Sequence, residues 1–151
     1  WAFMIIRNVF LGVRRFEALR ANLPISRKVL TERLDLLVAR GIVERRQYQD
    51  RPPRHEYRLT PMGVDLFPVL MALARWGDRW LAGEGGAPIE FVHRKCGQAT
   101  TARVVCAHCG EDIGAHNVQP RLGPGGEMPY AEAIEEAAGG RQVFLRPARA
   151  A

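Results

Sequence analysis

The hydrophobic positions near the start of the chain recur with the period of an α-helix. Phe3, Ile6 and Phe10 lie at helical spacing, and further apolar residues cover most of the remaining circumference. A helix that is apolar on all sides is expected to be buried. The pattern therefore predicts a helix over residues 1–11 that is buried on nearly all sides, and Gly12 is expected to end it.

The clearest amphipathic pattern lies in residues 26–41. Leucines recur there at i, i+4 and i+7, which places them on one stripe of a helix. Ser26 is a suitable N-cap, because its hydroxyl can accept a free backbone N–H of the first turn. Gly41 stands where a left-handed residue commonly ends a helix. The stripe consists of Leu30, Leu34 and Leu37.

A second, shorter helix is expected over residues 16–21, with Leu19 and Leu23 turned inward. The tight connection at residues 22–24 leads directly into Ser26. Two helices joined by a short turn, the second with an exposed polar face, are typical of a helix-turn-helix. The polar face by itself is also consistent with simple solvation, because most polar side chains of proteins face water.

After residue 41 the pattern changes to one typical of β-strands. Residues 42–48 and 55–59 predict two strands. Residues 49–54 between them are rich in proline and arginine, so they cannot continue the strand ladder. The inward-facing residues are expected to be Val43, Tyr57 and Leu59. A helix-turn-helix followed by a β-hairpin with a stiff cationic tip is a winged helix, and the predicted fold class is α+β.

A long helix is predicted over residues 61–81. Thr60 supplies an N-cap and Pro61 fits the first helical position, while Pro68 should kink the helix. The helix is apolar on more than one side, so a second copy of the same helix is the expected partner. Burial under the C-terminal segment is the alternative. The expected dimer interface consists of Phe67, Leu70, Met71, Ala74, Trp76 and Trp80.

The composition divides the chain into four segments. Residues 1–81 form the winged helix with its dimerisation helix, and residues 82–88 form a flexible linker. Residues 89–118 form a small zinc-knuckle segment with short strands, and residues 119–151 form a Gly- and Pro-rich extension. A short helix and an edge strand are expected within the extension, at residues 130–138 and 142–145.

Positive charge is concentrated in the winged part of the chain. The formal net charge is +6. Residues 1–83 contain 15 Lys and Arg against 8 Asp and Glu, whereas residues 84–151 contain 7 against 8. Arginine-rich domains favour phosphate partners, because the planar guanidinium matches phosphate oxygens. A solvated cationic face without a partner is the alternative.

No stretch of the sequence suits a membrane span or an export signal. The longest apolar run, residues 66–74, contains Pro68 and is followed by Arg75. Residues 1–13 lack the basic leader of a signal peptide. We therefore expect a cytoplasmic protein with reduced cysteines. Because the first residue is Trp1 and not Met, we expect the natural start to lie upstream.

The cysteines belong to two turns of the same form. Each turn has a ligand residue, two intervening residues, a cysteine and a glycine, in residues 93–97 and 106–110. This is the form of a zinc knuckle, in which glycine adopts the unusual backbone conformation after the second ligand. Four protein ligands close the coordination sphere of zinc, so the metal is expected to be structural. The predicted ligands are His93, Cys96, Cys106 and Cys109, with His108 or His116 as substitutes for His93.

Residues 1–80 carry motifs whose order and spacing are specific. They are LGVRRFEALR at 11–20, ISRKVLTERL at 25–34, GIVER at 41–45, PPRHEYRLT at 52–60 and PVLMALARWG at 68–77. On these motifs the chain resembles the HxlR family of bacterial winged-helix transcriptional regulators. The resemblance implies a homodimeric regulator that binds a pseudo-palindromic operator in double-stranded DNA, and we expect it to repress transcription.

The helix at residues 26–40 is the expected reading element. Recognition helices contact bases with their N-terminal residues, where the helix dipole also favours phosphate. Arginines at the start of the preceding helix should hold the DNA backbone, and those on the wing should reach a neighbouring phosphate or the minor groove. For Glu32 and Asp35 on the same polar face, solvation or pairing within the helix is favoured over base contact. The expected DNA-binding residues are Arg14, Arg15, Ser26, Arg27, Lys28, Thr31, Arg51 and Arg54.

Other function classes stay open from the sequence alone. The cysteine segment could act as a redox-active thiol pair, which would make the protein a thiol- or ligand-responsive sensor that releases DNA. The winged helix could also bind only another protein. An enzyme is least supported, because the sequence shows no nucleophile–base constellation and no phosphate-binding loop.

Overall fold

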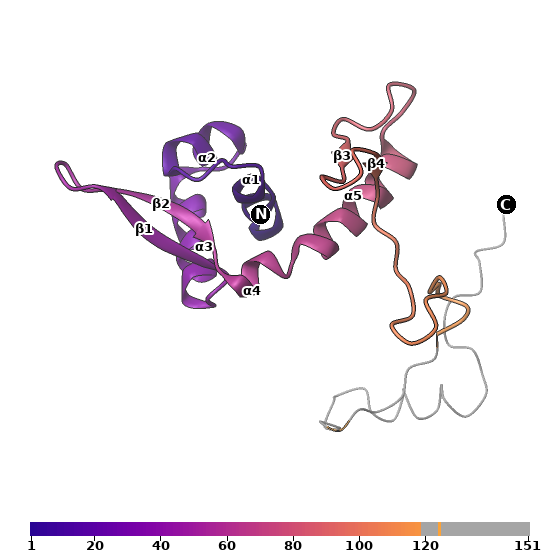
Figure 1. Ribbon diagram of the computed structural model, residues 1–151. Helices are drawn as coiled ribbons and strands as arrows, with labels where there is room; N and C mark the ends of the chain where they lie inside the picture. The colour runs from indigo at the N-terminus through magenta and orange to yellow at the C-terminus, as the bar shows by residue number, and fades with distance from the viewer. Residues whose placement is uncertain (119–123, 125–151) are drawn as a thin grey trace, which may run out of the picture. The chain divides into compact units, whose positions relative to one another are not determined.

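The computed structural model describes residues 1–118 and 124. They divide into two compact units, with residues 1–102 in the first and residues from 103 onward in the second. The helix and strand expected at 130–138 and 142–145 lie outside the described residues. In chain order (Figure 1) the elements are α1 (Ala2–Phe10), α2 (Phe16–Asn22), α3 (Arg27–Ala39), β1 (Val43–Gln49), β2 (Arg54–Leu59), α4 (Pro61–Val64), α5 (Phe67–Leu81), β3 (Phe91–Val92) and β4 (Ala99–Thr100).

One apolar core holds the first three helices against the β1–β2 hairpin. The predicted leucine stripe of α3 is confirmed, because its three leucines are buried in this core. They pack with residues from α1, from α2 and from the hairpin. The core consists of Ile5, Ile6, Val9, Leu19, Leu23, Leu30, Leu34, Leu37, Val43 and Tyr57. Burying a side chain of this size contributes about 1.5–3 kcal/mol, so the hydrophobic period fixes which face of α3 remains exposed.

Polar caps fix the two ends of α3. The Ser26 hydroxyl accepts the backbone N–H of Val29 at 3.2 Å, as predicted. Gly41 follows the helix with φ of 68°, a backbone conformation that favours glycine. The side chain of Thr60 donates to the carbonyl of Gly41 at 2.5 Å. This bond joins the end of α3 to the residue that follows the hairpin.

The wing is an antiparallel hairpin in which Val43 pairs with Leu59 and Arg45 with Tyr57. The register shifts between Gln47 and Gln49, and the hairpin tip extends away from the helices (Figure 1). The residues before α2 also join the wing, which the sequence pattern did not predict. Arg15 forms a β-bridge with Glu56, and the backbone N–H of Tyr57 donates to the carbonyl of Arg14 at 2.8 Å.

The segment after the wing contains two helices where the sequence predicted one. The Thr60 cap and Pro61 at the start of α4 are as expected. However, α4 ends at Val64, and α5 begins at Phe67 with Pro68 in its first turn. Proline lacks a backbone N–H, so it fits best in the first turn of a helix, where that donor would have no partner within the helix. The helix therefore restarts near Pro68 and does not continue through it with a kink.

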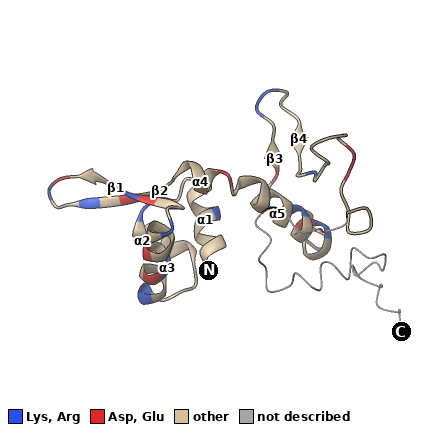
Figure 2. Cartoon of the chain, turned by 90° about the horizontal axis from the view of Figure 1, so that it is seen from below, with Lys and Arg blue, Asp and Glu red and all other residues tan. Residues whose placement is uncertain are grey.

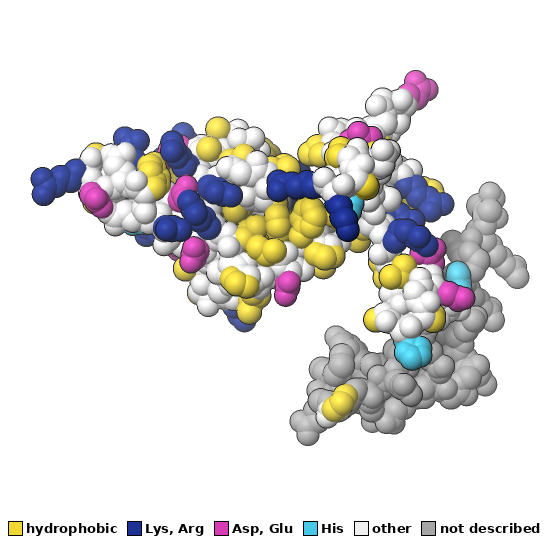
Figure 3. Space-filling view, viewed as in Figure 1, with side chains coloured by type: hydrophobic (Ala, Val, Ile, Leu, Met, Phe, Trp, Pro, Cys, Tyr) yellow, Lys and Arg dark blue, Asp and Glu magenta, His cyan; other side chains and the backbone are white. Residues whose placement is uncertain are grey.

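The first helix is less buried than the sequence predicted. Ile5, Ile6 and Val9 lie in the core, but Trp1 and Phe3 are about half exposed. The apolar circumference of α1 therefore serves two purposes, since one face packs on α3 and the other remains open within a single chain. Figure 3 shows hydrophobic side chains gathered over α1 and the region of α4 and α5.

The two faces of α5 also differ in burial. On the inner face the ring of Phe67 lies 5.1 Å from that of Phe10, and Leu70 packs against the core. Met71 and Ala74 are also partly buried. Four of the six residues predicted for the dimer interface are therefore partly buried within their own chain. Trp76 and Trp80 are exposed, together with two residues that the prediction did not include, Val69 and Leu73.

Short strands and turns surround the cysteines. In the first unit, β3 pairs with β4, and the turn of residues 93–97 lies between these two strands. In the second unit, Arg103 forms an ion pair with Asp112 at 2.8 Å, and the backbone of Val105 bridges to Asp112. The division at residue 102 therefore places the first cysteine turn with the winged helix, beyond the linker predicted at 82–88. Among the described helices none is long and apolar enough to cross a membrane.

Candidate nucleic-acid interface

Exposed cations occur at the start of α3, just before α2 and along the wing. Figure 2 shows Lys and Arg at one end of α3, along the hairpin and at its tip. The eight residues predicted to bind DNA are all exposed. The apolar core holds α2 and α3, which carry or adjoin six of these residues, whereas Arg51 and Arg54 lie at the hairpin tip.

The first turn of α3 presents two charged residues in succession, Arg27 and Lys28. The hydroxyls on either side are already engaged within the chain. Ser26 accepts from the helix as its cap, which leaves its own O–H free to donate. Thr31 donates its hydroxyl to the carbonyl of Arg27 at 3.0 Å, which leaves its methyl group and an acceptor for a partner. The Thr31 methyl group suits contact with the methyl group of a thymine, and the Ser26 O–H suits a hydrogen bond to a phosphate.

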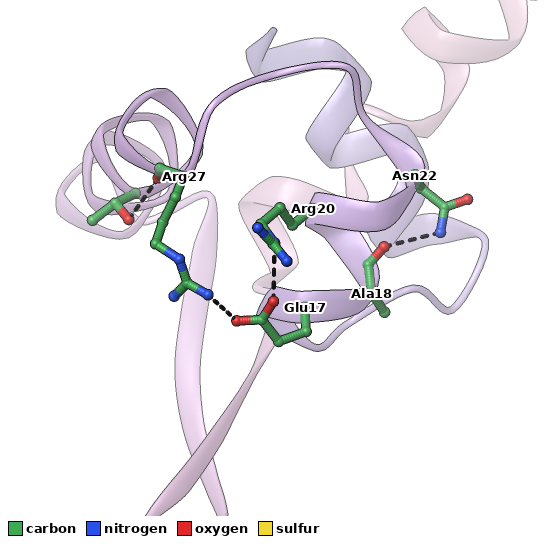
Figure 4. Close-up of polar contacts among 6 residues, drawn as sticks. Glu17, Ala18, Arg20, Asn22 and Arg27 are labelled. Carbon is green, nitrogen blue, oxygen red and sulfur yellow. Dashed lines mark hydrogen bonds and ion pairs between the residues drawn. The ribbon is translucent and has the colours of Figure 1, made fainter.

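The guanidinium of Arg27 is held from two sides by the start of α2. Its Nη2 lies 2.5 Å from Glu17 Oε1, and its Cζ lies 5.0 Å from the centre of the Phe16 ring. The other carboxylate oxygen of Glu17 accepts from Arg20 Nε at 3.0 Å (Figure 4). The hydrogen bond from Arg27 lowers the pKa of the Glu17 carboxyl below its ordinary value. This contact between helices was not predicted, because it depends on how α2 and α3 meet.

Arg14 and Arg15 lie where α2 meets the wing. Their backbone pairs with β2, as described above, and the Cζ of Arg15 lies 4.6 Å from the centre of the Tyr48 ring. The two arginines are therefore fixed at the junction and remain exposed. A contact of either side chain with a phosphate would position the wing and the reading helix together.

The wing tip is shaped by side-chain hydrogen bonds. Gln47 donates to the carboxylate of Asp50 at 2.9 Å, and Gln49 donates to the carbonyl of Arg51 at 3.0 Å. The Arg51–Pro52 peptide bond is cis. Two further exposed arginines of β1, Arg45 and Arg46, were absent from the predicted site. Strand alternation could have identified one of them, because successive side chains point to opposite faces of a hairpin.

Each cysteine turn has the local geometry of a zinc knuckle. In the first, His93 Nδ1 lies 3.2 Å from Cys96 Sγ, and Gly97 has φ of 71°. In the second, Gly110 has φ of 77° and donates its backbone N–H to the carbonyl of Cys106 at 2.8 Å. The backbone N–H groups of Cys109 and His108 lower the pKa of the Cys106 thiol.

Neither turn alone gathers a complete set of metal ligands. Among residues 1–118 and 124, no group of three or more His, Cys, Asp or Glu is placed to hold a metal ion. The three cysteines are free thiols. Each turn has the expected local form, but the joining of the two turns in one four-ligand zinc site stays a prediction.

A capped reading helix, a preceding helix that braces it and a cationic hairpin define the class of winged helix-turn-helix transcriptional regulators. The chain belongs to the HxlR-like helix-turn-helix family, whose sequence profile matches residues 1–84. This confirms the resemblance drawn from the motifs and identifies the protein as a DNA-binding transcriptional regulator.

Relatives and solved structures agree with this assignment. The chain is 47% identical over 125 residues to Rv3095, an uncharacterized HTH-type transcriptional regulator of Mycobacterium tuberculosis, covering 83% of this chain and 79% of that one. The structure of PA1607, a candidate transcription factor, matches with a TM-score of 0.70 and 28% identity over 80% of this chain and 84% of that one. PA1374 of Pseudomonas aeruginosa, also a candidate transcription factor, matches with a TM-score of 0.62 and 31% identity over 88% and 90%.

Proposed function

We propose that the protein is a cytoplasmic, homodimeric repressor that binds a pseudo-palindromic operator with one α3 in each half-site. The observation that carries the proposal is the set of exposed cations at the start of α3, together with Arg14 and Arg15 at the junction of α2 with the wing and the arginines of the wing itself. Recognition helices of this class enter the major groove with their N-terminal residues. A dimer bound at a promoter would exclude the transcription machinery.

Two roles can be distinguished among the predicted contacts. Arg27 and Lys28 enter the major groove, where Arg27 can reach base edges and Lys28 an adjacent phosphate. Arg14 and Arg15 bind the DNA backbone, and Arg51 and Arg54 extend the contact to a neighbouring phosphate or the minor groove. Two subunits would place their α3 helices about 34–36 Å apart, one turn of B-DNA.

The dimer would form through the outer face of α5 and the exposed face of α1. Val69, Leu73, Trp76 and Trp80 are between 49% and 64% exposed. Trp1 and Phe3 add further exposed apolar surface from α1. Large exposed apolar patches on one domain mark interaction surfaces, and a two-fold axis beside the outer face of α5 would bury the same patch on both subunits.

Sedimentation velocity tests this interface. Leu73→Glu or Trp76→Glu should convert the dimer to a monomer, because each places a charge in an apolar contact. Val92→Glu is the control, since Val92 is 53% exposed on β3, and its neighbour Phe91 makes the ring contact with Phe67 of α5. If Trp76→Glu stays dimeric, the interface lies elsewhere, and the C-terminal residues become the favoured cover for α5.

We further propose that His93, Cys96, Cys106 and Cys109 bind one structural zinc ion. Support comes from the donor set, since three thiolates and one imidazole suit tetrahedral zinc, and from the knuckle geometry of each turn. Zinc would compensate the negative charge of the three thiolates and would link the two cysteine turns. With four protein ligands it would have no open position for a reaction. Metal analysis of the purified protein should give one zinc per chain, and Cys96→Ser and Cys106→Ser should each lose it. Metal-free protein that rapidly forms a disulfide would favour the thiol-sensor alternative instead.

Direct DNA binding tests the main proposal. The full chain is titrated into fluorescent duplexes from the region upstream of its own gene, at several salt concentrations. A plot of the logarithm of the binding constant against the logarithm of the salt concentration should fall steeply. Each phosphate that the protein neutralises releases counterions and contributes about −0.9 to the slope of this plot. Absent binding or salt-insensitive binding to every fragment would overturn it and favour a winged helix that binds only proteins.

A further inference from the structure

A carboxylate of α2 lies between two arginines beside the reading helix. Glu17 accepts from Arg27 with one oxygen, at 2.5 Å, and from Arg20 with the other, at 3.0 Å (Figure 4). Phe16, the residue before it, lies beneath the guanidinium of Arg27. Two consecutive residues that open α2 therefore restrict the first charged side chain of α3.

This contact is too exposed to be explained by stability. The side chains of Glu17 and Arg27 are both 61% exposed, and ion pairs at such positions contribute little to folding because water screens them. The contact does restrict the orientation of Arg27. An arginine has many rotamers, and a side chain that is ordered before binding loses less conformational entropy when the complex forms.

The geometry leaves Arg27 able to bind a base while Glu17 holds it. A guanidinium has five N–H donors, and the contact with Glu17 is made through Nη2. Bidentate recognition of guanine uses two donors, directed at O6 and N7. A carboxylate on one edge of the guanidinium and a base on another are therefore compatible.

The same carboxylate changes how the site attracts phosphate. Arg20, Arg27 and Glu17 together carry one net positive charge where the arginines alone would carry two. Attraction to phosphate is independent of sequence and depends on net charge. Glu17 thus lowers the non-specific attraction without removing a donor that guanine needs. The hydrogen bond from Arg27 also keeps the pKa of Glu17 low, so the carboxylate remains ionised at neutral pH.

We propose that Glu17 is a specificity-determining residue, which orients Arg27 for bidentate contact with a guanine in each half-site and weakens its attraction to phosphate. This rests on the proposed function, because it requires α3 to lie in the major groove. Lys28 differs, since it has no carboxylate partner among the described residues 1–118 and 124 and suits a phosphate contact.

Selection of duplexes from a random-sequence pool tests the proposal without a known operator. The wild-type protein should enrich guanine at one position of each half-site. In the best duplex, replacing that guanine by 7-deazaguanine removes the N7 acceptor and should weaken wild-type binding about tenfold, as expected for loss of a bidentate contact. Glu17→Gln should reduce this loss to about threefold, strengthen binding to scrambled duplex and steepen the salt dependence.

Two further variants separate the possible outcomes. Glu84→Gln makes the same change of charge at an exposed position beyond α5 and should behave as the wild type. Arg27→Ala should be insensitive to 7-deazaguanine at that position. If Glu17→Gln keeps the full deazaguanine penalty and the wild-type salt dependence, the role of Glu17 is overturned while DNA binding stands. If the wild-type protein enriches no sequence, the proposed function fails first.

Discussion

The winged helix and the two cysteine turns are stabilised by different means. In the winged helix, ten buried apolar residues bring together three helices and a hairpin. In residues 93–97 and 106–110, every residue is exposed except Cys106, which is partly exposed. A segment without buried apolar surface has no hydrophobic contribution to offset its ordering entropy. The winged helix therefore has a hydrophobic core that offsets its ordering entropy, whereas the turns depend on hydrogen bonds and, on our proposal, on a metal.

The largest expected effect comes from removing a core side chain of the winged helix. Leu34 is fully buried, and Leu34→Ala should lower the free energy of unfolding by about 2–5 kcal/mol, because it removes apolar contacts and leaves a cavity. Leu36→Ala on the same helix should have a much smaller effect, since Leu36 is 41% exposed. Urea unfolding followed by circular dichroism measures both. Equal losses would show that α3 does not pack as described.

A second effect is expected where α4 approaches the hairpin. A Cβ at Gly63 would overlap the carbonyl oxygen of Ile42 and lie 2.9 Å from Leu59 Cδ2. Gly63→Ala should therefore cost about 1–3 kcal/mol through strain. Gly77→Ala, in the middle of α5 with open space around it, should be neutral or stabilise by up to about 1 kcal/mol. Thermal melting of the two variants compares them, and a stabilising Gly63→Ala would contradict the close approach.

A smaller effect separates the cysteine turns from the core. Cys106→Ser should abolish zinc binding but change the free energy of unfolding of the winged helix by less than about 0.5 kcal/mol, as for a surface substitution. Urea unfolding measures stability and atomic absorption measures zinc. Cooperative loss of the whole fold in this variant would show that the two regions depend on each other.

The smallest effect concerns the pH dependence of Glu17. Its pKa in the folded protein lies below the ordinary value of 4.5, mainly because of the hydrogen bond from Arg27. The ion pair is therefore present at neutral pH and is lost as the pH falls through that lowered pKa. NMR titration of the side-chain carboxyl should give a midpoint below 4.5, and Arg27→Gln should raise it. A midpoint unchanged by Arg27→Gln would contradict the contact.

The elements of the winged helix could be predicted from the sequence because their signals are local. The leucine spacing of α3, the Ser26 cap and the Thr60–Pro61 start of α4 each depend on a few neighbouring residues, and the structure confirms them. The break between α4 and α5 was missed because proline permits either a kink or a restart. The half-exposed face of α1 was missed because an apolar pattern shows which side chains favour burial, but not whether the same chain provides the surface that buries them.

The candidate site was predictable in composition but not in arrangement. The cations at the start of α3 and on the wing follow from a helix-turn-helix and hairpin pattern. The contact of Glu17 with Arg27 and the stacking of Arg15 on Tyr48 join residues from different elements. No spacing rule predicts them, because the angle at which α2, α3 and the hairpin meet is set by the core. The zinc ligands stay a prediction for the same reason, since their meeting depends on tertiary structure.

Binding of DNA by the start of α3 can be tested directly with two matched double variants. The double variant Arg27→Ala/Lys28→Ala is compared with Arg94→Ala/Lys95→Ala, which removes the same two charges from the first cysteine turn. Fluorescence anisotropy on the best selected duplex should show at least about tenfold weaker binding for the first variant. The salt dependence should also become less steep by about two phosphate contacts, one from Lys28 in each subunit. The second variant should bind as the wild type. Equal affinity of the two variants would contradict the placement of α3 in the major groove.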